Sequence, residues 1–511
     1  MTVTFAPAFL QTLPQGADYF RILPEIVLSV FGMIVMVLEP LLDERKGQKI
    51  LGVIALAGTV AGLEATWLMS QFPGLAFWNM VQVDGFSVFF HALIIAIAAI
   101  VILSSYEYMA VQRIRAGEYY ALILFGVVGM ALMSSAIELV LIFIALEISS
   151  ISSYVLAGFR RHEAASAESS LKYFLLGSFA TAFFLYGVAL MFGATGSTNI
   201  DHIGRVLQAG AIPLLAYVAV AFMFVGLGFK VAAAPFHVWT PDVYEGAPAP
   251  IVGFMSTAPK AAAFAVLLRV VFVINVHALF WVIWVSAALS MTLGNVGALV
   301  QNNVKRLLAY SSIAHAGYLL VAFAAAPGLG ISAAMFYTAA YAAMNLGAFA
   351  VVSHFANAGE RYVTLEDYEG LGRSSPLLAA TLTIFLLSLI GIPMTGGFFA
   401  KFYVFSAAVK ANLIWLTVIG VLNSGVGAYY YLRIIVMMYM RESRKEIPAT
   451  PVPLALALAL AACMAATLYL GIFPNGVLQY AQDSAQQLVQ QSPPATSSSS
   501  SALVPAVPAS L

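Results

Sequence analysis

Long apolar runs separated by short polar segments recur along almost the whole chain of 511 residues. A helix needs about 20 mostly apolar residues to cross the hydrocarbon core of a bilayer. Runs of about this length occur fourteen times, so we predict fourteen membrane-spanning helices. They cover residues 22–40, 50–70, 84–105, 119–136, 138–157, 169–193, 213–236, 248–272, 278–300, 303–324, 330–356, 376–405, 411–440 and 452–473.

The composition agrees with this pattern. Hydrophobic residues make up 62% and charged residues 9% of the chain, whereas soluble domains have roughly 45–50% and about 25%. This excludes a water-soluble fold. The formal net charge is zero and no basic block occurs, so nucleic acid is not an expected partner. A single cysteine, Cys463, excludes an intrachain disulfide or CxxC site, and we expect this chain to bind no cofactor or metal.

The distribution of Lys and Arg between the loops predicts the orientation. Cytoplasmic loops are enriched in these residues, and here alternate loops contain fourteen cations against three. We therefore predict both termini on the non-cytoplasmic side. The larger set is Arg45, Lys46, Lys49, Arg113, Arg115, Arg160, Arg161, Lys305, Arg306, Arg361, Arg373, Arg441, Arg444 and Lys445, and the smaller is Arg21, Arg205 and Lys410.

Two spans in corresponding positions contain helix breakers and one lysine each, GLGFKVAAAPF (226–236) and GIPMTGGFFAKF (391–402). Paired broken helices are typical of inverted repeats with an ion site at the breaks. The preceding spans also resemble each other, SSISSYVL (149–156) against SSIAHAGYLL (311–320). We predict an all-α polytopic membrane protein with these parts: helices 1–3 in residues 1–118, five-helix repeats in 119–272 and 273–440, a last span in 441–475, and a segment 476–511 whose Ser/Pro/Ala tail from Ser492 is disordered.

Of the charged residues within spans, four are the main candidates for a functional role, because an ionised group at the bilayer centre costs roughly 2.5–3.5 kcal/mol on insertion scales. They are Glu147, Lys230, Lys260 and Lys401. We expect each lysine to lie beside a helix break, where freed carbonyls and water solvate an ammonium and relay its proton. Glu147 is the expected partner of Lys230, because its distance would change the proton affinity of that lysine. Static counter-ions that only hold helices together are the alternative.

Further polar residues are candidates for supporting roles. His315 is an imidazole that can shuttle protons near neutral pH. Lys172 lies one turn from Glu168, and Glu118 begins a span. Arg269 and Arg433 lie toward span ends, and we expect them to be interfacial anchors.

The stretch APFHVWTPDVYEGAPAPIVGFMSTAPKAAAF (234–264) resembles the antiporter-like membrane subunits of respiratory complex I, the proton-pumping NADH:quinone oxidoreductase. It is most similar to the chain lettered N, and the resemblance covers roughly residues 20–475. It implies fourteen helices with two inverted five-helix repeats. It also implies proton-translocation roles for Glu147, Lys230, Lys260 and Lys401, and supporting roles for Glu118, Lys172 and His237.

The resemblance further implies that FMN, Fe-S clusters and quinone are bound by partner subunits. It implies neighbouring complex I membrane subunits as partners and a bacterial cytoplasmic membrane as the location. Two alternatives remain open at this point: a subunit of an Mrp-type sodium/proton antiporter, and a structural membrane scaffold.

Overall fold

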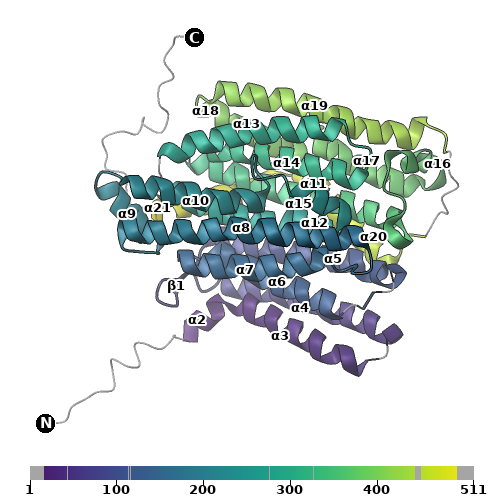
Figure 1. Ribbon diagram of the computed structural model, residues 1–511, viewed down its shortest axis with the longest axis horizontal. Coiled ribbons are helices and arrows are strands. Elements are labelled where there is room, and N and C mark those ends of the chain that lie inside the picture. The colour runs from purple at the N-terminus through teal and green to yellow at the C-terminus, as the bar shows by residue number, and fades with distance from the viewer. Residues whose placement is uncertain are drawn as a thin grey trace.

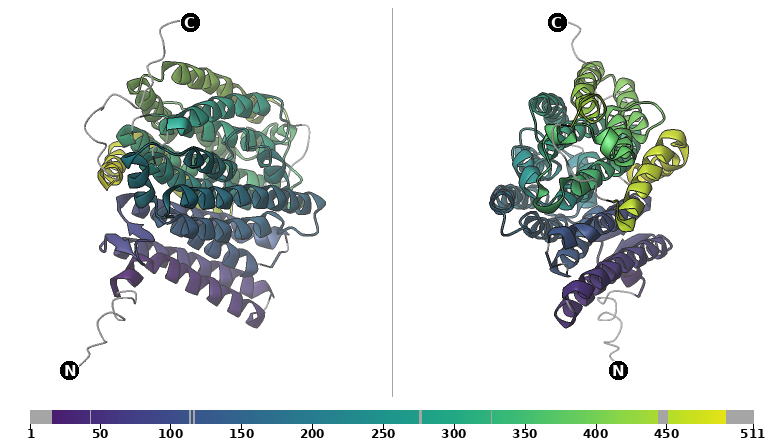
Figure 2. Two further views of the ribbon diagram at one scale, coloured as in Figure 1. Left: turned by 60° about the vertical axis from the view of Figure 1, so that its left-hand side comes forward. Right: turned by 90° about the vertical axis from the view of Figure 1, so that its right-hand side faces the viewer.

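The computed structural model describes residues 16–42, 44–112, 114–115, 117–274, 277–325, 327–443 and 451–491. In these ranges thirteen helices are long and apolar enough to cross a membrane. A fourteenth crossing is made by two shorter helices, α17 (Pro376–Ile390) and α18 (Gly396–Lys410). The long helices lie side by side (Figure 1), and a view turned by 90° shows several of them nearly end-on (Figure 2). The predicted fourteen-span, all-α fold is confirmed.

The spans divide into three leading helices, two groups of five and one last helix. The leading helices are α3 (Leu23–Leu38), α4 (Glu44–Met69) and α5 (Gly85–Gln112). The first group is α6 (Gly117–Ser135), α7 (Leu139–Ala157), α8 (Ala164–Thr195), α10 (Leu214–Val231) with α11 (Thr240–Gly246), and α12 (Ala249–Arg269). The second is α13 (His277–Leu299), α14 (Val304–Phe323), α15 (Pro327–Ala356), α17 with α18, and α19 (Ile414–Met440), and the last span is α20 (Leu454–Ile472).

The fourth span is broken in both groups of five. Because five is an odd number, consecutive groups enter the membrane from opposite ends, as the predicted inverted repeats require. The short elements lie between or beside the spans. They are α2 (Gly16–Arg21), η1 (Glu39–Leu41), the antiparallel hairpin β1 (Gly74–Ala76) and β2 (Val81–Val83), α9 (Ile200–Ala209), the π-helix η2 (Val270–Ile274), η3 (Ala358–Glu360), η4 (Leu365–Tyr368), α16 (Leu371–Ser374) and α21 (Asn475–Gln491).

Both predicted breaks lie next to a lysine. α10 ends one residue after Lys230, where Ala232 takes a left-handed conformation with φ of 59°. α17 ends at Ile390, and Gly391 follows with φ of 94°, a value that a glycine adopts without strain. At Gly397 the backbone of α18 packs so closely on the Ser388 carbonyl of α17 that a Cβ would overlap it. Glycine at this position therefore allows the two half-helices to pass each other.

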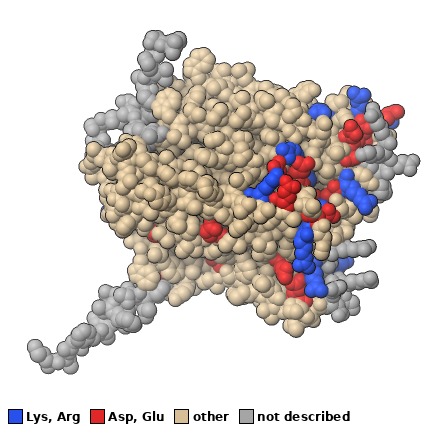
Figure 3. All heavy atoms as spheres, in the orientation of Figure 1, with Lys and Arg blue, Asp and Glu red and all other residues tan. Residues whose placement is uncertain are grey.

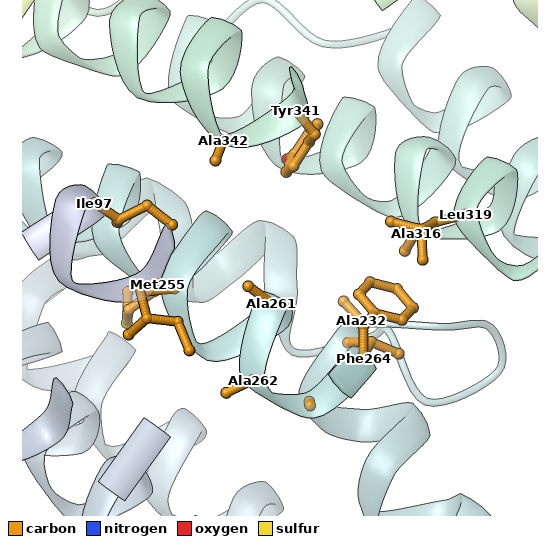
Figure 4. Close-up of a cluster of buried hydrophobic side chains, with 14 of the residues drawn as sticks. Ile97, Ala232, Met255, Ala261, Ala262, Phe264, Ala316, Leu319, Tyr341 and Ala342 are labelled. Carbon is orange, nitrogen blue, oxygen red and sulfur yellow. The ribbon is translucent and has the colours of Figure 1, made fainter. Parts of the chain in front are cut away.

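The predicted break beside Lys260 is wrong. Pro259 lies inside α12, and the helix continues through it to Arg269. Every residue of α12 is buried, so neighbouring helices hold it in place although the proline removes one hydrogen bond. Figure 4 shows part of the buried apolar cluster around α12, which includes Ala261 and Phe264 of α12, Leu319 of α14 and Tyr341 of α15.

Charged side chains gather at one end of the helices. We name this the basic end, where α3, α5, α7, α13, α15 and α19 finish, and we name the other, with the β1–β2 hairpin, α9 and α21, the charge-poor end. Figure 3 shows this clustering, while most of the visible face carries no charge. Many large apolar side chains on the outer faces of the spans are exposed, as expected of a lipid-facing surface.

One carboxylate at the basic end joins the two repeats. Glu360 Oε1 accepts hydrogen bonds from the Tyr108 hydroxyl at 2.7 Å and from the Ala249 backbone N–H at 2.7 Å. Its Oε2 lies 2.6 Å from Lys305 Nζ and 3.0 Å from Arg160 Nη1. Ala249 begins α12 and Lys305 is in the first turn of α14. Glu360 therefore fixes the starting points of two helices that carry candidate site residues.

The amphipathic helix α21 was not predicted, because it contains no apolar run long enough to cross a membrane. It buries Ala481, Ser484, Ala485 and Leu488, while Gln479, Gln482, Gln486 and Gln487 are exposed. The tail predicted from Ser492 lies outside the described residues, as do Arg113, Arg444 and Lys445.

Candidate proton-translocation site

Lys230, Lys260 and Lys401 are all buried, with exposed fractions of 3%, 3% and 8%. They come from α10, α12 and α18, so three different helices bring them into the interior. Among the described residues, no carboxylate oxygen lies within 4.0 Å of any of the three amino groups. Each ammonium is instead held by uncharged oxygen atoms.

Lys230 is bound by the helix that carries Glu147. Its Nζ donates to Ser150 Oγ of α7 at 2.9 Å, and it lies 6.0 Å and 5.7 Å from the ring centroids of Tyr154 and Tyr173. Glu147 is one turn before Ser150, and its charge interacts with Lys230 without forming an ion pair. The buried Glu147 Oε1 has no hydrogen-bond partner in the described part of the chain. Glu147 and Lys230 therefore lie close enough for their charges to interact, but they form no direct hydrogen bond or ion pair.

Lys260 is bound by α14 of the second repeat. Its Nζ donates to Ser312 Oγ at 2.6 Å and contacts the Ser312 carbonyl oxygen at 3.3 Å. The same hydroxyl oxygen accepts a hydrogen bond from Tyr341 of α15 at 2.8 Å. In the similar stretches SSISSYVL and SSIAHAGYLL, Ser150 and Ser312 occupy the same place. Both aligned serines bind a lysine.

A polar cluster lies between Lys260 and Lys401. His315 Nδ1 is 2.7 Å from the Tyr337 hydroxyl, and its Nε2 is 3.3 Å from the Tyr431 hydroxyl. Tyr431 also hydrogen-bonds Ser311, the residue before the Lys260 acceptor. The His315 ring packs against Tyr341, with centroids 5.1 Å apart. His315, a predicted supporting residue, thus lies at the centre of hydroxyl groups from three helices.

Lys401 uses the helix break in the predicted manner. Its Nζ donates to the carbonyl oxygens of Leu389 at 3.0 Å and Ile390 at 2.8 Å, the last two residues of α17. It also donates to Ser424 Oγ of α19 at 2.8 Å and lies 5.0 Å from the Tyr318 ring. The break therefore supplies free carbonyls to an ammonium at Lys401. Lys230 differs, because its hydrogen bond is to a serine hydroxyl.

The remaining predicted residues lie at the margins of this chain of groups. Lys172 is in contact with Glu168 and with Asp242 of α11, at 2.7 Å each, and its side chain is 41% exposed. Glu118 is exposed in the first turn of α6. His237 is half-buried between α10 and α11, and its Nδ1 has no hydrogen-bond partner among the described residues.

The two arginines predicted to be interfacial anchors differ. Arg433 donates to Asn302 and to nearby backbone carbonyls at the basic end. For Arg269 the prediction is wrong: it is 1% exposed and bound bidentately by Asp84. Asp84 is 185 residues from Arg269 in the sequence, and a hydropathy pattern does not reveal a contact between such distant residues.

Comparison with known proteins decides the family. The model for the membrane domain described as "NADH:quinone oxidoreductase/Mrp antiporter, TM" matches residues 136–427. NADH-quinone oxidoreductase subunit N 2 of Koribacter versatilis (strain Ellin345) is 68% identical, covering 93% of this chain and 98% of its own. The chain belongs to the NADH-quinone oxidoreductase subunit N family. Subunit N 1 of Solibacter usitatus (strain Ellin6076) is 51% identical, covering 94% and 99%. The resemblance inferred from the sequence is confirmed.

Solved structures agree with this membership in the subunit N family. A chain of respiratory complex I from Thermus thermophilus with bound Aureothin is 38% identical with a TM-score of 0.77, covering 89% of this chain and 98% of that one. A chain of the Mrp complex from Dietzia sp. DQ12-45-1b has a TM-score of 0.78 at 21% identity, covering 91% and 97%. This second likeness shows a shared fold.

Sequence reasoning missed several acceptors in this subunit N chain. Ser150, Tyr341, Tyr431 and Ser424 hold or adjoin the predicted lysines and histidine. Serine and tyrosine are common in membrane helices and carry no charge, so their presence alone gives little signal. The similarity between residues 149–156 and 311–320 was the one available indication for Ser150.

Proposed function

We propose that this chain translocates protons as the N subunit of a respiratory NADH:quinone oxidoreductase. Membership in the subunit N family supports the assignment to that complex. The observation that carries the proton-translocating role is the set of three buried lysines held by hydroxyl and carbonyl oxygens.

This mode of binding is suited to proton exchange. A lysine paired with a buried carboxylate leaves an uncompensated anion when it loses its proton, at a cost of several kcal/mol. A serine hydroxyl or a carbonyl oxygen is neutral, so a neutral amine beside it leaves no unpaired charge. Lys230, Lys260 and Lys401 can therefore give up a proton to a neighbouring group without leaving an uncompensated buried anion beside them.

The order of groups along the interior gives the proposed route. Glu147 and Lys230 form its first part, Lys260 with Ser312 and Tyr341 its second, and the His315 cluster leads to Lys401. Successive parts are not all joined by direct hydrogen bonds, and we propose that water relays the proton between them. A change in the separation of Glu147 and Lys230 would alter the proton affinity of the lysine and start the transfer.

The chain would act with partners that perform the redox chemistry. We propose that FMN, Fe-S clusters and quinone are bound by other subunits, and that this chain couples to them through neighbouring membrane subunits. We further propose a bacterial cytoplasmic membrane with the basic end in the cytoplasm, because loops rich in Lys and Arg are retained there. Both termini would then lie on the opposite side.

The test uses the assembled complex in liposomes, with NADH oxidation and internal acidification measured together. Lys230→Ala and Glu147→Ala should each strongly reduce the number of protons moved per electron. Lys410→Ala is the matched control, because Lys410 is an exposed lysine at the end of α18.

Undiminished pumping in both Lys230→Ala and Glu147→Ala, with the complex assembled, would refute the proposal and favour a scaffold. Purification with small hydrophobic chains alone, without flavin and Fe-S subunits, would favour an antiporter.

A further inference from the structure

A second set of buried titratable groups lies apart from the lysines, toward the charge-poor end. Glu25 of α3 and His91 of α5 are 4% and 0% exposed, and His91 Nε2 is 2.9 Å from Glu25 Oε1. Both helices belong to the three leading spans, outside the two repeats that contain the lysines. The proton route proposed above does not use this pair.

The hydrogen bonds of His91 determine where its protons lie. His91 Nδ1 is 2.8 Å from the Ser87 carbonyl oxygen, which can only accept, so Nδ1 carries a hydrogen. Ser134 Oγ lies 2.9 Å from the same nitrogen and donates its own hydrogen to the Ala131 carbonyl, so it accepts as well. The remaining contact, Nε2 to Glu25 Oε1, therefore contains one shared proton.

That shared proton has two possible positions. On Nε2 it gives an imidazolium facing a carboxylate, and on Oε1 it gives a neutral imidazole facing a carboxylic acid. Glu25 Oε2 is buried and has no hydrogen-bond partner among the described residues. An ionised carboxylate with one unsatisfied oxygen is costly in an apolar interior. Oε2 is therefore an open position at which the pair can take up a second proton, after which one proton can be given up and the single shared proton remains.

A buried ion pair lies next to Glu25 and His91 and holds the backbone of their neighbours Ser87 and Ser134. Arg269 Nη2 lies 3.0 Å from both carboxylate oxygens of Asp84, and its Nε donates to the Ser134 carbonyl at 3.3 Å. Asp84 Oδ1 also accepts from the Ser87 backbone N–H at 2.7 Å. The charged and titratable groups around the site on packed elements are Arg269 on α12, Asp84 before α5, Asp201 on α9 and Tyr480 on α21.

We propose that Glu25 and His91 form a proton-release site for this chain at the charge-poor end. The pair receives one proton from the interior and gives one to water at that end, so that it returns to its starting state with a single shared proton. Arg269 and Asp84 act as positioning residues, because they fix Ser87 and Ser134, the two acceptors that orient the imidazole. This inference rests on the proposed proton translocation.

The experiment compares variants of the assembled complex in liposomes, with NADH oxidation and proton uptake measured together. Glu25→Gln keeps the size and a hydrogen-bonding group but cannot release a proton, and His91→Gln removes the imidazole. Both should retain NADH oxidation and lose proton translocation. Glu64→Gln is the matched control, because Glu64 is exposed on the neighbouring helix α4, and it should pump normally.

A Lys260→Ala variant measured alongside separates the two proposals. Loss of pumping in Lys260→Ala with normal pumping in Glu25→Gln and His91→Gln overturns the release site and leaves the proposed function intact. Normal pumping in all three variants overturns the proposed function itself. If only one of Glu25→Gln and His91→Gln assembles, proton translocation by that variant decides whether the pair is a release site. If neither assembles, the pair is a structural contact between α3 and α5, and the proposal is overturned.

The infrared difference spectrum between the oxidised and the NADH-reduced complex gives a second readout. A carboxylic acid C=O band that changes on reduction and is absent in Glu25→Gln supports a proton that moves at this residue. An identical spectrum in wild type and Glu25→Gln contradicts it.

Discussion

Replacing Glu360 by glutamine keeps the shape of the side chain and removes its charge. The carboxylate joins Lys305 of α14, Arg160 of the loop after α7 and the start of α12. Lys305 and Arg160 have side chains only 1% and 9% exposed. In Glu360→Gln, Lys305 would stay buried without its carboxylate partner, and Arg160 would keep only Glu163, a largely exposed side chain 4.0 Å away. Removing one partner of a buried ion pair costs about 3–5 kcal/mol, so we expect a destabilisation of this size.

The rate of thermal inactivation of the purified complex measures this effect. The control is Glu442→Gln, the same substitution at an ion pair with Arg373 in which both side chains are largely exposed. Such pairs contribute little, so the control should inactivate at the wild-type rate. Equal inactivation of Glu360→Gln and the control would refute the reasoning.

The pH dependence provides a second check on the same residue. Burial raises the pKa of Glu360, but Lys305 and Arg160 outweigh it and hold the pKa below its ordinary value of 4.5. A depressed pKa contributes stability that is present above the unfolded value and lost as pH falls through the folded value. The difference in stability between wild type and Glu360→Gln should therefore begin to shrink as the pH falls below about 4.5, and it should vanish only once the pH is below the lower pKa of the folded state.

Three more predictions concern proton translocation. Ser312→Ala removes a hydrogen bond to an ammonium, typically about 1.5–3 kcal/mol, and should lower proton translocation relative to Ser70→Ala, which removes an exposed hydroxyl. Gly397→Ala should separate α17 from α18 at a cost of about 1–3 kcal/mol and lower pumping, whereas Gly425→Ala, where a Cβ meets nothing within 4 Å, should not. Arg433→Gln, which loses contacts at the basic end, should pump nearly as wild type in the same liposome assay.

Hydropathy predicted the number of spans because each crossing requires its own apolar run. The breaks at Lys230 and Lys401 were predicted correctly from Pro and Gly, while the break at Pro259 was not. Local sequence gives the tendency of a proline to interrupt a helix, but the packing around α12 decides whether the interruption occurs. The short helix α21 was missed, because it does not cross the membrane.

The buried lysines could be identified from the sequence because an ionisable group in an apolar run is costly wherever its neighbours lie. The pairing of each lysine with a particular acceptor could not be predicted, since Ser312 is 52 residues from Lys260 and Ser150 is 80 residues from Lys230. Glu360 lies in a short polar segment and resembles an ordinary loop residue. Its burial depends on four contacts from distant segments.

The most direct test of proton translocation through the buried lysines is the ratio of protons moved to electrons transferred by the reconstituted complex carrying Lys260→Ala. This lysine belongs to the first repeat, donates to Ser312 of the second, and has no described carboxylate oxygen within 4.0 Å. We predict that NADH oxidation persists and that the ratio falls, while Lys410→Ala keeps the wild-type ratio. An unchanged ratio in an assembled Lys260→Ala complex would contradict this account.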